Sequence, residues 1–368
     1  MRYIISGGGT GGHIYPALAI AKEIKNYDQD AEILYIGTKD SLEAELVPKE
    51  GIPFKAIRVK GLPRRINKNF FISLKELFIG LRQSQAIIDD FKPDMVIGTG
   101  GYVCGPIVYK AAKNNIPTLI HEQNAFPGIT NKILSRYVDR VATTFEESAK
   151  YFKYPDRVVN TGNPIRGEIL NRDKKASYKK LDIDPNKPLV LSFGGSGGQK
   201  SLNDAIIDIL LNDSWSDDFQ LIHVTGKRLY EGFMKSLEEK NITLKGNIRI
   251  LPYLYDMPDA LNIADLLISS SGAITLAEAS AIGLPSILIP KSYTAENHQE
   301  YNARAFEKAG ASVVILEKDL SGQLLMETIE DLLRDRGKLR RMSINSKKLG
   351  NINATKEILK LVRELMAK

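Results

Sequence analysis

Cysteine is almost absent from this chain of 368 residues, in which Cys104 is the only one. A single cysteine excludes a framework of intrachain disulfides, and it indicates a reducing compartment. We interpret Cys104 as a small buried hydrophobic residue, because free cysteine packs in cores much as a small apolar side chain does.

Long apolar runs are absent as well. No run approaches the ~18 residues that would span a bilayer. The apolar stretch "YIIS" leads directly into glycines, so we expect no signal peptide before the first strand. The sequence therefore predicts a protein that is soluble or peripheral to a membrane.

Residues spaced as metal ligands are also lacking. No paired ligand spacing occurs among the four histidines, which are His13, His121, His223 and His298. Two Asp-x-Asp strings, Asp28–Asp30 and Asp182–Asp184, stand before expected strands, and we interpret them as solvated turn residues. We predict neither a bound metal nor a cofactor.

The charge excess is modest but local. The net charge is +7, and residues 55–68, "KAIRVKGLPRRINK", hold six basic residues and no acidic one. A basic patch can meet the phosphates of a nucleic acid, an anionic lipid or a nucleotide. We do not expect nucleic acid as a partner, because no recognised binding motif accompanies the charge.

Apolar residues follow this basic segment directly. The stretch "RRINKNFFISLKELFIG" places them beside cations, an arrangement that suits contact with a membrane interface. The alternative is a loop followed by a helix that packs on the core. The candidate membrane residues and their apolar neighbours are Arg64, Arg65, Lys68, Phe70, Phe71, Leu74, Leu77 and Phe78.

Length and pattern favour an α/β protein with two domains. The chain is too long for one comfortable core. Short β-branched runs alternate with amphipathic helical stretches, which predicts parallel sheets covered by helices. The expected strands are "RYIIS", "EILYIG", "DMVIGTG", "TLIHE", "RVATT", "PLVLSFGG", "FQLIHVTG", "IRILPYL", "LLISSSG" and "SILIP".

The plan of the N-terminus recurs half a chain later. "YIISGGGTGGHIYPALAI" and "LVLSFGGSGGQKSLNDAI" both read as strand, glycine-rich turn and helix, and we predict that one copy opens each domain. The boundary is expected near residues 160–169, where glycine and proline break regular structure. The predicted domains are residues 1–162 and 163–350, and residues 351–368 form a helix that could pack back on the first domain.

The two glycine turns point to a ligand with phosphates. Ligands bind beyond the carboxyl ends of parallel strands, and a glycine turn there lets backbone N–H groups and a helix N-terminus approach an anion. The turn "GGGTGG" also satisfies G-x-G-x-x-G, a weak signal for NAD. The second strand, "EILYIG", ends in Gly37, Thr38 and Lys39, so the acid that an NAD site needs there is missing.

His13 stands directly after the first glycine turn. One interpretation is a histidine that caps or packs the helix start, and the other is a functional group at the carboxyl end of the strand. The positive end of the helix disfavours the imidazolium, so we expect a neutral ring that can accept a proton.

Six segments occur in order over nearly the whole chain: "GGGTGGHIYPALA", "GTGGYVCGP", "HEQNAFPGITNK", "GNPIR", "GGSGG" and "SSGAITLAEASAIGLPSILIP". Together they resemble the MurG family of UDP-N-acetylglucosamine–N-acetylmuramyl-(pentapeptide) pyrophosphoryl-undecaprenol N-acetylglucosaminyltransferases. Each segment alone is only suggestive, whereas six in this order are a specific signal.

The resemblance implies a GT-B glycosyltransferase fold, in which two Rossmann-like domains with parallel sheets face an interdomain cleft. The donor, UDP-N-acetylglucosamine, would bind mainly the C-terminal domain. The acceptor, lipid I, would reach the N-terminal domain from the cytoplasmic face of the cell membrane, to which the protein would bind peripherally. The implied reaction is an inverting β-1,4 transfer to the muramyl C4 hydroxyl, which yields lipid II and UDP in peptidoglycan synthesis.

This chemistry needs a general base and a stabilised leaving group, but no covalent nucleophile. The resemblance makes His13 the first candidate for the base. Glu122 of "HEQN" is the rival, or a partner that orients the site. The alternative for Glu122 is a loop carboxylate that accepts hydrogen bonds from nearby backbone N–H groups.

Further site residues are implied by matching family positions. Ser196 in the second glycine turn would donate to the pyrophosphate, and Glu278 would accept hydrogen bonds from both ribose hydroxyls. Leu254 would read uracil through its backbone, or simply pack in the core. The remaining predicted substrate contacts are Thr10, Gly11, Gly12, Asn124, Arg166, Ala273, Ile274, Thr275, Leu276, Ala277 and Gln299, the last of which could share its role with His298.

Two positions depart from some relatives, because Gly197 and Ser270 stand where larger side chains such as glutamine and arginine occur.

Three alternative functions remain beside the transferase: an NAD-dependent oxidoreductase, a UDP-sugar 2-epimerase with a similar two-domain fold, and a subunit that only binds the donor.

Overall fold

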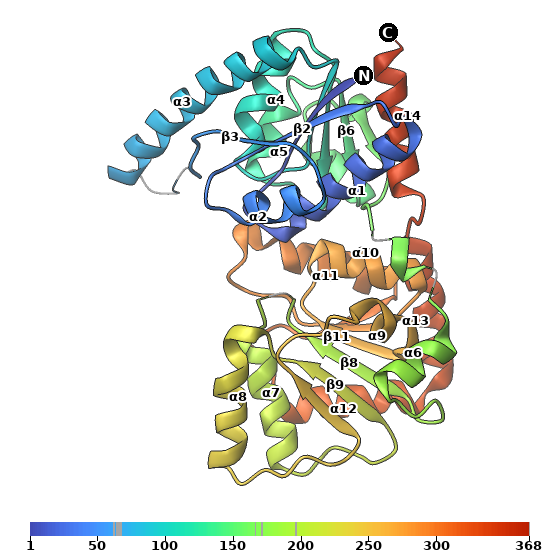
Figure 1. Ribbon diagram of the computed structural model, residues 1–368. Coiled ribbons are helices and arrows are strands. Elements are labelled where there is room, and N and C mark those ends of the chain that lie inside the picture. The colour runs from blue at the N-terminus through green and yellow to red at the C-terminus, as the bar shows by residue number, and fades with distance from the viewer. Residues whose placement is uncertain (62, 64–67, 166, 171, 196, 368) are drawn as a thin grey trace. The chain divides into compact units, whose positions relative to one another are not determined.

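The computed structural model describes residues 1–61, 63, 68–165, 167–170, 172–195 and 197–367. The chain divides into two compact units (Figure 1). Unit 1 comprises Met1–Ile165 and Ile352–Lys368, and unit 2 comprises Arg166–Asn351. The boundaries expected from the sequence fall after residues 162 and 350, whereas the units divide after Ile165 and Asn351.

Unit 1 contains a seven-stranded sheet in which all paired strands are parallel. Along the sheet, its strands are β3 (Phe54–Ala56), β2 (Glu32–Gly37), β1 (Arg2–Ser6), β4 (Met95–Gly98), β5 (Thr118–Glu122), β6 (Arg140–Thr143) and β7 (Val158–Asn160). The central strands are buried on both faces, which explains the apolar runs of β1 and β4.

Helices cover both faces of this sheet. The residues of one strand alternate between the two faces, so Ile5 belongs to one buried cluster and Ile4 to the other. The helices of unit 1 are α1 (Gly11–Tyr27), α2 (Leu42–Lys49), α3 (Lys68–Phe91), α4 (Cys104–Lys113), α5 (Ile129–Leu134) and α14 (Ala354–Met366). Helix α14, from the end of the chain, lies beside α1 and adds Ile358 and Val362 to the cluster of Ile5 (Figure 1).

Unit 2 repeats the architecture with a six-stranded parallel sheet. Along the sheet, its strands are β10 (Ile248–Leu251), β9 (Gln220–Val224), β8 (Leu189–Phe193), β11 (Leu266–Ser269), β12 (Ser286–Leu288) and β13 (Ser312–Val314). Its helices are α6 (Lys174–Leu181), α7 (Lys200–Leu211), α8 (Lys227–Glu239), α9 (Met257–Ile263), α10 (Ala273–Ile282), α11 (His298–Lys308), α12 (Gly322–Arg334) and α13 (Arg336–Leu349).

All ten strands expected from the sequence are confirmed. The three strands that the sequence did not predict, β3, β7 and β13, are each three residues long and lie at sheet edges. The interpretation of Cys104 is also confirmed: the side chain is fully buried, and desolvation raises the pKa of its thiol to about 12. None of the helices within the described ranges is long and apolar enough to cross a membrane.

Candidate functional site

The first glycine turn connects the carboxyl end of β1 to the start of α1. Gly9 has φ of +84°, a left-handed conformation that glycine adopts without steric cost. The N-cap of α1 is Thr10, and the predicted contacts Gly11 and Gly12 form its first turn, directly before His13. The first helical turn of α1 carries no acidic side chain of its own, so the positive end of the helix is available to a ligand.

A buried carboxylate braces this turn, and sequence reasoning missed it. Glu43, on α2, is fully buried, and it accepts hydrogen bonds from the backbone N of Gly9 (3.2 Å) and from N and Oγ1 of Thr38 (3.2 and 2.8 Å). Burial alone would raise the pKa of Glu43, but these hydrogen bonds hold it below its ordinary value. An ionised carboxylate therefore occupies a backbone N–H that a pyrophosphate on this turn would use, which weakens the NAD alternative.

The imidazole of His13 contacts residues from two other sequence segments. Its Nδ1 is 3.1 Å from the carbonyl oxygen of Thr99 and 2.9 Å from Oε1 of Gln123. Thr99 also donates from Oγ1 to the carbonyl oxygen of His13 (2.7 Å), which fixes the backbone of the same residue. The segments "GTGG" and "HEQN" thus meet at His13. The ring is half-buried, so one side of it remains accessible.

The hydrogen bonds continue from Gln123 into the sheet. Its Nε2 donates to the carbonyl oxygen of Thr99 (2.7 Å) and lies 2.9 Å from Nδ1 of His121. Nε2 of His121 is in turn 3.0 Å from the carbonyl oxygen of Gly162. Both Gln123 and His121 are almost fully buried, and desolvation lowers the pKa of His121 to about 4.

Both carboxylate oxygens of Glu122 accept hydrogen bonds from neighbouring residues, which is not what a base waiting for a substrate proton would do. Its Oε1 accepts from the backbone N and Nδ2 of Asn124 (3.0 and 3.1 Å). Its Oε2 accepts from the backbone N of Gly128 (3.1 Å) and from Nδ2 of Asn131 (2.8 Å). Both oxygens therefore accept hydrogen bonds from the loop after β5 and from α5, which favours the loop-carboxylate alternative. The predicted sugar contact Asn124 uses its amide in the same loop.

In unit 2, the second glycine turn follows β8 and precedes α7. Glu317 braces its far end, accepting from Nε2 of Gln199 (2.9 Å) and Oγ of Ser201 (2.6 Å), as Glu43 does in unit 1. The predicted contacts Ser196 and Arg166 lie outside the described residues. A side chain added at Gly197 would meet open space, so this departure leaves room beside the turn.

The segment "SSGAITLAE" joins β11 to α10. The N-cap of α10 is Gly272, which has no side chain to cap the exposed N–H groups, and the first turn, Ala273, Ile274, Thr275 and Leu276, is uncharged. Ala277 and Glu278 follow, and Glu278 is 4% exposed, which excludes the interpretation of a solvated helix glutamate. Ser270, the second departure, is buried before this helix.

Gln299 and Leu254 are both buried in unit 2. The backbone N of Lys291 donates to Oε1 of Gln299 (3.0 Å), and Oγ of Ser271 donates to its carbonyl oxygen (2.6 Å). Gln299 is thus held against the loop that follows β11. The Leu254 side chain belongs to the hydrophobic core, which confirms that its side chain packs internally.

The candidate membrane residues divide between two environments. Phe71 and Phe78 on α3 are 64% and 61% exposed, whereas Leu77 packs against the core and Leu74 is half-buried. Phe70 is half-buried and contacts Phe71 edge to face, with ring centroids 5.8 Å apart. Arg64 and Arg65 lie outside the described residues, as does the side chain of Lys68.

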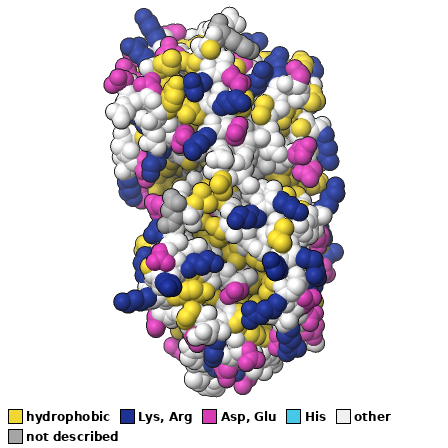
Figure 2. Space-filling view, turned by 90° about the vertical axis from the view of Figure 1, so that its right-hand side faces the viewer, with side chains coloured by type: hydrophobic (Ala, Val, Ile, Leu, Met, Phe, Trp, Pro, Cys, Tyr) yellow, Lys and Arg dark blue, Asp and Glu magenta, His cyan; other side chains and the backbone are white. Residues whose placement is uncertain are grey.

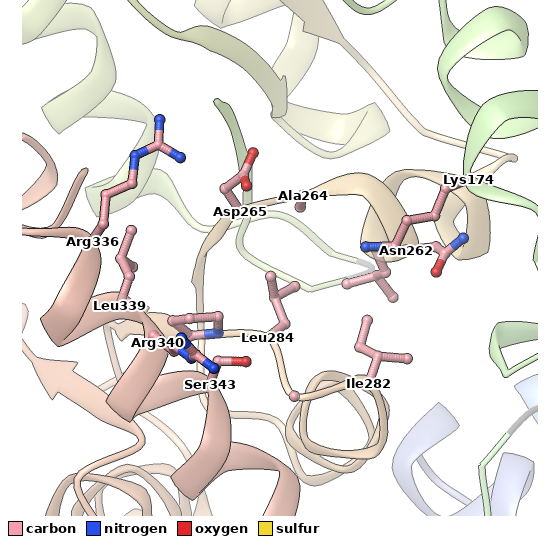
Figure 3. Close-up of a pocket in the computed structure, with 13 residues that line it drawn as sticks. Lys174, Asn262, Ala264, Asp265, Ile282, Leu284, Arg336, Leu339, Arg340 and Ser343 are labelled. Carbon is pink, nitrogen blue, oxygen red and sulfur yellow. The ribbon is translucent and has the colours of Figure 1, made fainter. Parts of the chain in front are cut away.

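One pocket of about 300 Å³ lies elsewhere in unit 2 (Figure 3). Asp265 and Pro285, which line it, directly precede β11 and β12, so the pocket is beside the amino ends of these strands. The glycine turn and the start of α10 stand at the opposite, carboxyl ends. The pocket in Figure 3 is therefore separate from the predicted donor contacts.

Neither the charge on the face drawn in Figure 2 nor the metal-ligating residues in the described part of the chain indicate a further site. On the face drawn in Figure 2, Lys and Arg side chains are interspersed with Asp and Glu. Among the residues that the structure describes, no group of three or more His, Cys, Asp or Glu could hold a metal ion. His223 is buried between Oγ of Ser192 (2.9 Å) and Oδ1 of Asn203 (3.1 Å), where it has a structural role.

Comparison with known proteins covers both units. Residues 3–143 match the glycosyltransferase family 28 N-terminal domain, and residues 189–362 match the glycosyltransferase family 28 C-terminal domain. A protein of Acetivibrio thermocellus is 51% identical over 366 residues, which cover 100% of this chain and 98% of the relative. It is named UDP-N-acetylglucosamine–N-acetylmuramyl-(pentapeptide) pyrophosphoryl-undecaprenol N-acetylglucosamine transferase.

Solved structures support the same assignment. The crystal structure of MurG from Acinetobacter baumannii superposes with a TM-score of 0.77, at 26% identity and with 99% of each chain covered. A UDP-N-acetylglucosamine 2-epimerase from Neisseria meningitidis has a TM-score of 0.69 at 15% identity, covering 99% of this chain and all of its own, which shows a shared fold alone. The two parallel-sheet units have the GT-B fold, as predicted, and the chain belongs to the MurG family of glycosyltransferases.

Proposed function

We propose that this protein transfers N-acetylglucosamine from UDP-N-acetylglucosamine to the muramyl C4 hydroxyl of lipid I, forming lipid II with a β-1,4 link. The observation that carries the proposal is the 51% identity, over the full chain, to a relative named for this transfer. The epimerase alternative has only fold similarity behind it, at 15% identity.

His13 is the general base of this proposal. Its Nδ1 faces the oxygens of Thr99 and Gln123, so Nε2 is the ring nitrogen left to face a substrate. Nε2 takes the proton of the acceptor hydroxyl as the hydroxyl oxygen attacks the anomeric carbon of the donor. The bond from that carbon to the β-phosphate oxygen breaks, its electron pair leaves with UDP, and the α donor becomes a β product.

Unit 2 supplies the donor site. The open N-terminus of α10 offers backbone N–H groups and a positive helix end to the diphosphate, whose negative charge grows as the sugar leaves. Glu278, four residues after Ile274 on the same helix, accepts hydrogen bonds from the ribose hydroxyls. The described part of the second glycine turn leaves space beside Gly197 for the same diphosphate.

The acceptor is lipid-linked, and we place the protein at the cytoplasmic face of the cell membrane as a peripheral protein. The supporting surface is one face of α3, where Phe71, Lys75, Phe78 and Arg82 recur every three or four residues and are all exposed. Aromatic rings with intervening cations suit the boundary between acyl chains and anionic headgroups.

The test is a transfer assay with purified protein, radiolabelled UDP-N-acetylglucosamine and a lipid I analogue. We expect labelled disaccharide-lipid and UDP, with no nicotinamide added. Turnover of the donor without acceptor, which releases an epimerised sugar, would replace this proposal with the 2-epimerase. Donor binding without any turnover would instead favour the donor-binding subunit.

A further inference from the structure

A line of hydrogen bonds runs from the backbone of Gly162 to the imidazole of His13, through the side chains of His121 and Gln123. We propose that Gln123, backed by His121, is a positioning residue that holds His13 in the tautomer protonated on Nδ1 and leaves Nε2 free of hydrogen. The inference rests on the proposed role of His13 as the base, because only that role requires a defined tautomer.

The donors and acceptors in this line of hydrogen bonds can be assigned by starting from Gly162. The carbonyl oxygen of Gly162 can only accept a hydrogen bond, so Nε2 of His121, 3.0 Å away, carries a hydrogen. His121 is fully buried and its pKa is lowered to about 4, so the ring is neutral at physiological pH. A neutral imidazole carries one ring hydrogen, and Nδ1 of His121 is therefore an acceptor.

The next step fixes the amide of Gln123. Its Nε2 lies 2.7 Å from the carbonyl oxygen of Thr99, 2.9 Å from Nδ1 of His121 and 3.1 Å from the carbonyl oxygen of His121. All three are acceptors, so the NH₂ group must face them, and a flipped amide would bring oxygen against oxygen. Oε1 of Gln123 consequently points toward His13.

The final step decides the tautomer of His13. Its Nδ1 meets two oxygens, Oε1 of Gln123 at 2.9 Å and the carbonyl of Thr99 at 3.1 Å, and neither has a hydrogen to donate. Nδ1 of His13 must therefore be the donor. In the neutral ring the lone pair is then on Nε2, which is the form that can accept a substrate proton.

An amide suits this place better than a carboxylate. Many catalytic histidines are oriented by Asp or Glu, which adds a negative charge behind the ring. Both substrates of the proposed reaction carry a diphosphate, and such a charge would oppose their approach. Glu122, the neighbour of Gln123 in sequence, accepts hydrogen bonds at both carboxylate oxygens from the loop after β5 and from α5, so it leaves the orienting role to the neutral side chain.

The tautomer can be read directly from imidazole nitrogen shifts. The chain has four histidines, so protein labelled with ¹⁵N-histidine gives few signals, and His13→Ala identifies those of His13. We expect wild-type His13 to show a protonated Nδ1 and an unprotonated Nε2 at about pH 8, where an ordinary imidazole is neutral. A hydrogen on Nε2 in the wild-type protein would overturn the proposal, whatever any variant does.

Kinetics of Gln123→Met test the consequence. Methionine has a similar volume but neither acceptor nor donor amide, so we expect a mixture of His13 tautomers and a fall in kcat of about tenfold or more. The KM for UDP-N-acetylglucosamine should stay within about threefold, because the diphosphate and ribose contacts proposed at α10 are in unit 2. The matched control is Gln323→Met on α12, an exposed glutamine whose Nε2 donates to Glu327, which should keep wild-type kcat.

The two failures can be told apart. If the nitrogen shifts show the expected tautomer but His13→Ala turns over normally, the base assignment fails and the hydrogen-bonded arrangement stands. If His13→Ala is inactive while Gln123→Met keeps both wild-type kcat and the wild-type tautomer, the positioning role of Gln123 is wrong and the base assignment survives.

Discussion

Gly100 lacks a side chain at the place where the ring of His13 lies. A Cβ built on Gly100 would stand 2.7 Å from Nδ1 of His13, which is closer than real Cβ contacts allow, and 3.0 Å from its Cε1, which is tighter than most of them. Gly100 also has φ of +105°, which side chains rarely tolerate. The segment "GTGG" is therefore a cradle for the imidazole, in which Thr99 supplies hydrogen bonds and Gly100 supplies space.

Substitution of Gly100 should consequently act on His13. We expect Gly100→Ala to lower kcat by about tenfold or more, because the ring must leave its hydrogen-bonded position. Gly128→Ala is the control in the same unit, since an added Cβ there meets nothing within 4 Å. The measurement is the steady-state transfer rate of both variants. Equal rates would show that Gly100 does not constrain the position of the His13 ring.

Removal of the base should affect turnover more than binding. We expect His13→Ala to reduce kcat by about 10²–10⁴-fold, the usual range for general-base catalysis. The dissociation constant for UDP, measured by calorimetry, should change little because the diphosphate and ribose contacts proposed at α10 are in unit 2. A variant that keeps the wild-type turnover number would remove His13 from this role.

Donor affinity should depend on Glu278 instead. Hydrogen bonds to a charged group contribute about 1.5–3 kcal/mol, so Glu278→Gln should weaken UDP binding by about tenfold. Glu327→Gln, on the exposed face of α12, is the matched control and should bind UDP normally. Calorimetric titration with UDP measures both, and unchanged affinity in Glu278→Gln would contradict the ribose assignment.

Glu43 should make the stability of unit 1 depend on acid pH. The folded-state pKa of Glu43 is below its ordinary value of 4.5, so its contribution is present above that pH and lost as pH falls through the folded pKa. We expect Glu43→Gln to lower the free energy of unfolding by about 1–3 kcal/mol near neutral pH. Below about pH 4.5 the difference between variant and wild type should shrink.

Urea denaturation at several pH values tests this expectation, with circular dichroism reporting on both units. The only tryptophan, Trp215, is buried in unit 2, so its fluorescence gives an internal control that Glu43→Gln should leave unchanged. A loss of stability that is the same at every pH would show that the ionised carboxylate is not the source.

Membrane binding should depend on the outward face of α3. We expect Phe71→Ser with Phe78→Ser to reduce binding to vesicles that contain anionic lipid, because two exposed rings are removed from the interface. Ile344→Ser on α13, which removes an apolar side chain that is 50% exposed, should bind as the wild type does. Sedimentation with vesicles measures the bound fraction, and equal binding of the two variants would assign α3 to another role.

The sequence predicts the fold well because its signals are local. The apolar runs of the buried strands and the glycine turns after β1 and β8 are each visible within a few residues. The edge strands β3, β7 and β13 are missed because three residues are too few to establish a pattern. Their pairing depends on a neighbouring strand that the local sequence does not reveal.

The site is predicted less completely, for a related reason. His13 and Glu278 stand beside glycine turns or helix starts, which local sequence marks. Gln123 and Glu43 act through contacts with residues 110 and 34 positions away, His13 and Gly9, which only the fold brings together. In the segment "HEQN", the charged residue Glu122 is the more obvious candidate from the sequence. In the structure, the contact with His13 is made by the amide of the next residue, Gln123.

The place of α14 affects how the protein forms during synthesis. Unit 2 is complete once Asn351 has emerged from the ribosome, but unit 1 still lacks the helix that covers part of α1. Domains generally fold as units while the chain is being made, with the N-terminal one first. Here the order is reversed for the last step: the apolar flank of the N-terminal unit stays open until α14 has been synthesised, and Ile358 and Val362 then close it.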